Sequence, residues 1–276
     1  MNKIINLKHF KVSNNLPFFL ISGPCQLESR DHALFMAENI KKICNKLKIN
    51  LVFKTSFDKA NRTSLTSKRG LGLDKSIKIF EEIKKNLDLP ILTDVHTSEQ
   101  CEILKNVIDI IQIPAFLCRQ TDLLISAAKT NLIVNVKKGQ FLAPWDMKNV
   151  IKKISDSNNE NILVTERGVS FGYNTLVSDM RAISILKKEK YPVIFDATHS
   201  VQQPGGKGGE SGGEREFVYD LSKAAISIGI AGLFLEVHDN PDQAPSDGLN
   251  MLKLSDLESF LINLKKIDDL IKNNDL

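Results

Sequence analysis

The sequence contains no long apolar stretch. No segment approaches the roughly 18 consecutive apolar residues that a membrane-spanning helix requires. The opening segment, MNKIINLKHFKV, also lacks the apolar core of a signal peptide. We therefore expect no membrane partner and a cytoplasmic location.

Cysteines are few, and no two of them form a C-x-x-C pair. The four are Cys25, Cys44, Cys101 and Cys118. A chain of 276 residues can bury a large core without a disulfide framework. We expect reduced thiols in a reducing compartment.

Charge of one sign is not in large excess either. The net charge is +4, and the lysines are spread over many expected helix faces instead of forming one block. This distribution argues against a nucleic-acid partner but is compatible with small anionic substrates. Apolar residues make up 42% of the chain and charged residues 25%, close to the average of soluble globular proteins, which excludes a disordered or fibrous class.

What the sequence does contain is a series of eight short, apolar, β-branched runs, each typical of a fully buried strand. They begin at Pro17, Asn50, Pro90, Asp109, Leu132, Ile162, Val193 and Gly232. Segments with apolar residues three and four apart lie between the runs and predict helices. These segments are 32–47, 74–87, 121–130, 147–154 and 176–189, with a last helix from about 254 to 272.

The alternation of strand and helix predicts parallel strands with right-handed crossovers. Eight such units favour a single α/β domain, a TIM (β/α)8 barrel over residues 1–276, above an open doubly wound sheet. Residues 1–16 precede the first strand, and we interpret them as an N-terminal extension that forms a plug or hairpin under the barrel. The glycine-rich segment 202–213 is typical of a mobile loop over a site.

Cationic side chains occur repeatedly where the predicted strands end. They are Lys54, Lys59, Arg62, Lys137 and Arg167. In a barrel of this type the carboxyl ends of the strands form the active-site mouth, so the five cations should converge there and repel one another unless an anionic ligand neutralises them. Phosphate and carboxylate groups fit such a cluster. The alternative is that each cation pairs with a carboxylate of a neighbouring helix.

Potential metal ligands fall at the same mouth. Cys25, His199 and Glu236 end the first, seventh and eighth strands, and Asp247 follows in the next loop. Thiolate, imidazole and carboxylate groups together can hold a divalent metal. Taken singly, Cys25 is equally well a small buried apolar residue and His199 a core histidine. Asp94, at the end of the third strand, could bind a substrate hydroxyl or act as an acid or base.

Several strand-end segments carry a resemblance to a known family. They are GPCQLES from Gly23, FKTSFDKANRTS from Phe53, LTDVH from Leu92, IQIPAFLCRQTDLL from Ile111, NVKKGQF from Asn135, ERGVSFGYNTLVSDM from Glu166, FDATHSVQQPGG from Phe195 and LFLEVHDNPDQAPSDG from Leu233. Together they resemble the 3-deoxy-D-manno-octulosonate 8-phosphate synthases over nearly the whole chain. The resemblance implies a transferase that joins phosphoenolpyruvate to D-arabinose 5-phosphate and releases inorganic phosphate, in the biosynthesis of lipopolysaccharide.

The resemblance also implies roles for individual residues. Lys59, Lys137 and Arg167 would hold phosphoenolpyruvate. Asn61, Arg62 and Asp94 would hold the sugar phosphate. Lys54 and Gln112 complete the expected substrate-binding set, and Arg119 would reach the sugar's phosphate in a neighbouring subunit of a homotetramer. We expect Lys59, Asp94, Lys137 and His199 to be the catalytic residues.

The family has a metal-dependent branch and a branch with asparagine at the first strand's motif. Cys25 in that motif and the APSDG segment resemble the metal-dependent branch, which implies Cys25, His199, Glu236 and Asp247 as ligands. The ion stays open among zinc, iron, manganese and cobalt.

Three other functions are compatible with parts of the pattern. The related aromatic-pathway synthase uses erythrose 4-phosphate, but it carries a Lys-Pro-Arg-Thr segment where this chain has KANRT. Sialic-acid-type synthases would leave Arg62 without an obvious partner. A non-catalytic sugar-phosphate binder should have lost members of the cationic and metal-ligating sets, and all of them are present.

Overall fold

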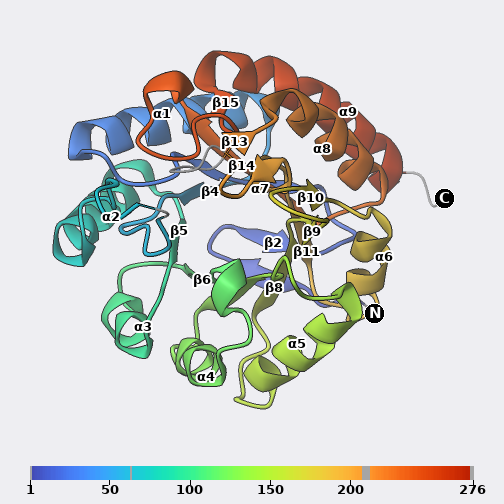
Figure 1. Cartoon of the computed structure of the whole chain (residues 1–276). Coiled ribbons are helices and arrows are strands. Elements are labelled where there is room, and N and C mark those ends of the chain that lie inside the picture. Colours follow the sequence, from blue (N-terminus) through green and yellow to red (C-terminus); the bar gives the residue numbers. More distant parts are fainter. Residues whose placement is uncertain (1, 63, 207–211, 274–276) are drawn as a thin grey trace.

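The protein is described by a computed structural model that covers residues 2–62, 64–206 and 212–273. Eight parallel strands close into a barrel at its centre (Figure 1). They are β3 (Phe19–Gly23), β4 (Leu51–Lys54), β5 (Ile91–Asp94), β6 (Ile110–Ile113), β7 (Ile133–Lys137), β8 (Ile162–Glu166), β11 (Val193–Asp196) and β14 (Gly232–His238). Each pairs with the next, and β14 pairs with both β11 and β3 to complete the ring. The predicted barrel and its eight strands are confirmed.

Helices surround the barrel on its outside (Figure 1). They are α1 (Arg30–Leu47), α2 (Leu73–Leu87), α3 (Ser98–Leu104), α4 (Thr121–Lys129), α5 (Met147–Ser155), α6 (Arg181–Lys187), α8 (Val218–Ser227) and α9 (Leu257–Asn273). The sequence explains where α1 begins. The Ser29 hydroxyl accepts the backbone N–H of His32 and so caps the helix at its start. The helix ends at Lys48, which has a left-handed backbone. None of the helices in the described part of the chain is long and apolar enough to cross a bilayer.

One predicted helix was too long. Residues 176–189 were expected to be helical, but Leu176–Val177 forms strand β10, which pairs with β9 (Val169–Ser170). The turn between the two strands contains Gly172 and Asn174, both with positive φ. The Asp179 carboxylate then accepts the backbone N–H of Arg181, so α6 begins only there. Tertiary pairing of the hairpin therefore overrides the helical spacing.

The N-terminal residues close the amino end of the barrel as a hairpin. Strand β1 (Ile5–Leu7) pairs antiparallel with β2 (Phe10–Val12). Ile5, Leu7 and Val12 are buried and pack in the same apolar cluster as the residues inside the barrel. The expected plug is present, and it leaves the carboxyl end of the barrel as the place for a site.

Two successive inward positions can be followed on each barrel strand, because alternate residues of a strand point to the same face. We call these two sets of residues the lower and the upper layer. The lower layer is apolar, with one residue from each strand: Ile21, Val52, Leu92, Ile110, Ile133, Leu163, Ile194 and Phe234. The residue two positions later on each strand belongs to the upper layer: Gly23, Lys54, Asp94, Gln112, Asn135, Thr165, Asp196 and Glu236. Seven of these eight are polar or charged, so chemistry is confined to the carboxyl end.

Short elements shape the mouth above the upper layer. They are α7 (Ala197–Ser200), β12 (Gln202–Gln203), β13 (Gly212–Gly213), β15 (Leu252–Lys253) and the 3-10 turns Ala115–Leu117, Pro144–Asp146, Arg215–Phe217, Pro241–Gln243 and Leu254–Asp256. Strands β12 and β13 pair with each other. Part of the predicted glycine-rich loop, residues 207–211, lies outside the described residues, so its mobility stays a prediction.

Candidate active site

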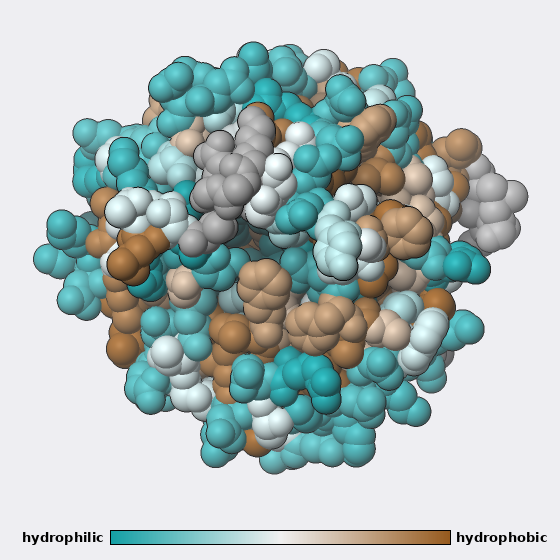
Figure 2. Space-filling model, viewed as in Figure 1, coloured by the Kyte–Doolittle hydropathy of each residue, from teal (hydrophilic) through white to brown (hydrophobic). Residues whose placement is uncertain are grey.

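A cavity of about 600 Å³ opens at the carboxyl end of the barrel. All five predicted cations line it, together with Asn61, Asp94, Gln112, His199 and Asp247. The space-filling view shows hydrophilic residues around this central hollow and hydrophobic ones beside it (Figure 2). Cys25 and Glu236 are buried directly below, in contact with Asp247 and Lys54. The structure therefore brings together the predicted site residues, with the exception of Arg119.

Two of the five cations form short ion pairs within the protein itself, and Lys59 Nζ lies 3.9 Å from Glu236 Oε1. Lys54 Nζ lies 2.5 Å from Glu236 Oε1 and also donates to the Cys25 carbonyl at 3.0 Å. Lys137 Nζ lies 2.6 Å from Asp196 Oδ2. The expectation that only a ligand could balance the cluster was therefore wrong for this pair. The partners are carboxylates of the barrel's upper layer, not of neighbouring helices.

Burial and these ion pairs act in opposite directions on the carboxylates. Burial alone would raise the pKa of Glu236, but Lys54 and His199 hold it well below its usual range. Burial would likewise raise the pKa of Asp196, and His199 and Lys137 hold it low. Both carboxylates are therefore ionised at neutral pH. Burial lowers the pKa of Lys137, an effect that Asp196 opposes.

Three of the four predicted metal ligands meet at one point, and His199 lies beside one of them. Ligand atoms of Cys25, Glu236 and Asp247 all lie within 4.8 Å of one another. The Cys25 Sγ is 3.1 Å from Asp247 Oδ2, and His199 Nε2 is 3.6 Å from Glu236 Oε2. The donor set of one sulfur, one nitrogen and two oxygens suits a borderline divalent cation.

Three observations test whether these residues fit a metal. Glu236 Oε2 is buried and has no hydrogen-bond partner among the described residues. Burial and the charge of Glu236 raise the pKa of the Cys25 thiol well above its ordinary value, so a thiolate there needs a cation. Asp196 Oδ2 holds His199 Nδ1 at 2.8 Å, which leaves Nε2 free toward Glu236, the usual orientation of a metal-binding histidine. The residues fit the group.

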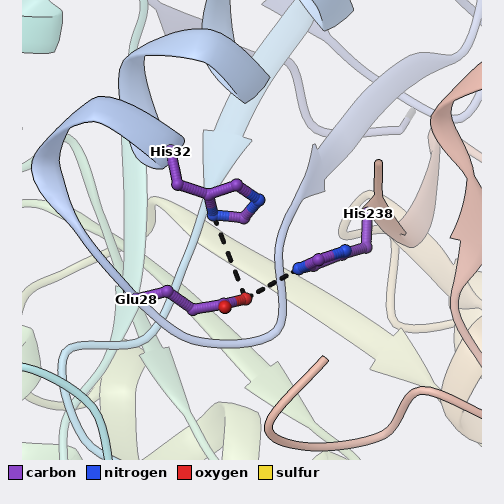
Figure 3. A group of neighbouring side chains, drawn as sticks. All are labelled: Glu28, His32 and His238. Carbon is purple, nitrogen blue, oxygen red and sulfur yellow. Dashed lines mark hydrogen bonds and ion pairs between the residues drawn. The ribbon is translucent and has the colours of Figure 1, made fainter. Parts of the chain in front are cut away.

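A second cluster, Glu28, His32 and His238, also brings three ligand-type side chains together (Figure 3). His238 Nε2 lies 2.7 Å from Glu28 Oε1, while His32 Nδ1 is 3.9 Å from the same oxygen. The backbone N–H of Asn240 donates to His238 Nδ1 at 2.9 Å. The proton of neutral His238 must therefore be on Nε2, where it bonds to Glu28. The cluster is therefore better explained as a hydrogen bond than as a metal site. This bond connects the loop that follows Cys25 to the end of β14.

A chain of hydrogen bonds crosses the upper layer of the barrel. Thr165 Oγ1 donates to Asn135 Oδ1 at 2.7 Å, and Asn135 Nδ2 donates to Gln112 Oε1 at 2.9 Å. Gln112 Nε2 donates to Asp94 Oδ1, and Ser56 Oγ donates to Asp94 Oδ2 at 2.8 Å. Asn135 and Thr165 were not among the site residues predicted from the sequence. Their position two residues after an inward apolar residue was the signal that could have found them.

Arg119 lies away from the cavity of its own chain. It is exposed and lines a separate surface depression with Asp146 and Lys153. The predicted role of Arg119 concerned a neighbouring subunit, so its position in one chain leaves that role a prediction.

Comparison with known proteins identifies the family. Residues 3–273 match the family model described as the DAHP synthetase I family. The chain is 60% identical over 272 residues to a Rickettsia prowazekii protein named 2-dehydro-3-deoxyphosphooctonate aldolase, with 99% of each chain covered. Proteins of the same name from Bartonella tribocorum and Brucella anthropi are 58% identical over 271 residues, with 98% of each chain covered. The chain therefore belongs to the DAHP synthetase I family and, within it, to the 2-dehydro-3-deoxyphosphooctonate aldolases.

Proposed function

We propose that this enzyme condenses phosphoenolpyruvate with D-arabinose 5-phosphate and water to give 3-deoxy-D-manno-octulosonate 8-phosphate and inorganic phosphate. The observation that carries the proposal is the convergence of five cations and four metal-ligand side chains on one cavity. The name shared by relatives that match nearly the whole chain supports the same reaction. The product would serve the biosynthesis of lipopolysaccharide.

Phosphoenolpyruvate would bind deepest, against Lys59, Lys137 and Arg167. Lys137 and Arg167 are 6% and 4% exposed and lie next to the upper layer of the barrel. The Arg167 guanidinium donates to Gln202 Oε1 at 3.0 Å through Nη2, while its buried Nη1 has no partner among the described residues. A free donor beside a lysine suits a phosphate or carboxylate oxygen.

The sugar phosphate would bind nearer the rim. Arg62 lines the cavity and donates to the Pro245 carbonyl at 3.0 Å, with the rest of its guanidinium available for the phosphate. Asn61 is exposed at the same edge, and Asp94 and Gln112 lie inside it. Carboxylate and amide groups suit the hydroxyls of a sugar.

Charge balance supports a divalent metal held by Cys25, His199, Glu236 and Asp247. The five cations of the cavity are accompanied by four carboxylates, those of Asp94, Asp196, Glu236 and Asp247. The protein alone therefore has little positive charge left for two phosphorylated substrates. A bound zinc, iron, manganese or cobalt ion would add positive charge and polarise the aldehyde oxygen of the sugar.

The chemical steps need few groups beyond those present. The C3 atom of phosphoenolpyruvate bonds to the aldehyde carbon and water adds to C2, after which the C2–O bond to phosphate breaks. The attacking water gives up two protons in all. One ends on the aldehyde oxygen, and the other passes from the C2 hydroxyl to the departing phosphate as the C2 keto group forms, so the reaction needs no external acid or base. Lys59, Asp94, Lys137 and His199 would hold the reactants in attack geometry and carry these protons.

We further propose that the enzyme works as a homotetramer in which Arg119 reaches a neighbouring cavity. Large apolar side chains are exposed around the mouth: Phe116, Phe141, Trp145, Phe171 and Tyr173. Such a group of exposed aromatics is typical of a protein–protein interface. Arg119 lines the depression beside them.

The test is release of inorganic phosphate from phosphoenolpyruvate with either arabinose 5-phosphate or erythrose 4-phosphate, before and after treatment with a chelator. We expect release with arabinose 5-phosphate that a chelator abolishes and added metal restores. Dependence on erythrose 4-phosphate would assign the chain to the related synthase reaction. Release that resists complete removal of metal would keep the substrates and contradict the metal.

A further inference from the structure

We propose that Asn135 and Thr165 are positioning residues that fix the Asp94 carboxylate toward the sugar substrate by acting through Gln112. The proposal rests on the function proposed above and adds to it two residues that touch no substrate. Gln112 and Asp94 line the cavity, whereas Asn135 and Thr165 are fully buried below it.

The register of the barrel strands brings these side chains into line. Asp94 of β5 pairs with Gln112 of β6, and Gln112 pairs with Asn135 of β7. Thr165 of β8 lies across from Lys137, two residues beyond Asn135 on β7, and its hydroxyl reaches the Asn135 amide. All four side chains are thus held by adjacent strands of a closed sheet, whose backbone leaves them little freedom.

The donors and acceptors allow only one direction of donation along this series of hydrogen bonds. Burial alone would raise the pKa of Asp94, but Lys59 and Lys54 hold it well below its usual range, so its carboxylate only accepts hydrogen bonds. Gln112 must then present its Nε2 to Asp94, which leaves Oε1 to accept from Asn135.

The Asn135 amide is fixed in the same way. With its Nδ2 given to Gln112, its Oδ1 must find a donor in a fully buried place, and that donor is the Thr165 hydroxyl at 2.7 Å. A reversed Asn135 amide would set its oxygen against the Gln112 oxygen and leave both without a donor. The network is therefore complete in one arrangement only: Asp94 requires the Gln112 Nε2, Gln112 Oε1 requires the Asn135 Nδ2, and the Thr165 hydroxyl supplies the donor that Asn135 Oδ1 requires.

The decisive experiment is the substitution Asn135→Asp, which keeps nearly the same shape and, as a carboxylate, has no hydrogen to donate to Gln112 Oε1. We expect Gln112 to turn its oxygen toward Asp94 and disturb the sugar subsite. The KM for arabinose 5-phosphate should rise at least about tenfold, while the KM for phosphoenolpyruvate should stay within about threefold. A residue that only stabilised the fold would change both constants alike or neither.

A second pair of variants decides the matter if the buried carboxylate introduced by Asn135→Asp prevents folding. Thr165→Val keeps the shape and removes the hydroxyl, and it should raise the sugar KM by roughly three- to tenfold, while Thr165→Ser should restore it. Equal changes in both KM values, or an unchanged sugar KM with the Val variant, would overturn the proposal. Failure of the unmodified enzyme to use arabinose 5-phosphate would instead contradict the proposed function.

Discussion

At the scale of single residues, Asp196 shows how one buried carboxylate organises the site. Its oxygens accept from Lys137 Nζ, from the His199 ring and from the His199 backbone N–H within α7. The same residue therefore orients a proposed substrate-binding cation and a proposed metal ligand. Its place in the upper layer, two residues after Ile194, follows from the period of a β-strand.

Replacement of Cys25 by Ser should remove the metal. A serine hydroxyl is not ionised at neutral pH and binds zinc or iron far more weakly than a thiolate. We expect the metal content per chain after desalting, measured by elemental mass spectrometry, to fall at least about tenfold, with loss of activity in parallel.

The matched control for this experiment is Cys44→Ala. Cys44 is also fully buried, but it belongs to neither group of neighbouring ligand-type side chains among the described residues. The control should keep its full metal content. Retention of metal by the Cys25→Ser variant would remove Cys25 from the ligand set.

Five residues of the candidate site could be predicted because they are charged side chains at or beside the end of a buried strand: Lys54, Asp94, Lys137, Arg167 and Glu236. Asn135 and Thr165 could not be predicted in this way, because each lies inside an apolar run and carries no charge. Whether such a residue points inward depends on strand register, which the ring of eight strands fixes and one strand alone does not.

At the scale of elements, the last turn of α9 fastens the lower end of the barrel. Lys272 donates to the carbonyls of Ile230, at 2.9 Å, and of Asn14. One turn earlier, Asp268 Oδ2 accepts the backbone N–H of Phe18 at 2.9 Å. Helix α9 thereby holds both the entry to β3 and the entry to β14.

This fastening should depend on pH through Lys272. Burial lowers its pKa to about 8, below the ordinary value of about 10.4 that it regains on unfolding. Between these two values the unfolded chain binds more protons, so stability rises with pH. Relative to Lys272→Met, the wild type should gain about 1 to 2 kcal/mol of unfolding free energy between about pH 7.5 and 9.5.

Urea unfolding of the two proteins at both pH values measures this difference. A stability gap that stays constant with pH would show that the ammonium titrates at its ordinary pKa. Lys265→Met, on the same helix, is the control, because the Lys265 ammonium pairs only with Asp269 among the described residues and donates to no barrel carbonyl there.

The elements themselves were predictable to different degrees. The strands β3 to β8, β11 and β14 were found because a fully buried parallel strand is a continuous apolar run. The helix over 176–189 was overestimated, since the pairing of β9 with β10 depends on contacts that spacing does not encode. Helices α3 and α8 were not named in advance. Helix α3 has only seven residues, and α8 places the small residues Ser222 and Ala225 at buried positions, so its apolar stripe is weak.

At the scale of the whole molecule, the exposed aromatics at the mouth should control assembly. Trp145 is 65% exposed, next to Asp146, which lines the same depression as Arg119. We expect Trp145→Asp to weaken the proposed tetramer, because a charge in the centre of an apolar interface is costly to bury. Sedimentation velocity should show smaller species, and activity should fall with dilution if Arg119 acts across the interface.

Phe35→Asp is the control for this prediction. Phe35 is 47% exposed but lies on α1, on the outside of the barrel. This variant should sediment as the wild type does. A wild-type protein that sediments as a monomer at all concentrations would contradict the tetramer.

The hairpin of β1 and β2 closes the barrel at its amino end, so in the part of the chain that the structure describes the cavity is accessible from the carboxyl end alone. Reactants and products must then pass through the same opening. The substrate that binds deeper in the cavity therefore has to bind first. If phosphoenolpyruvate is held by Lys137 and Arg167 as proposed, it should bind before the sugar phosphate that would cover it near Asn61. Excess sugar phosphate should therefore bind before phosphoenolpyruvate, block its access to the cavity and slow the reaction by substrate inhibition.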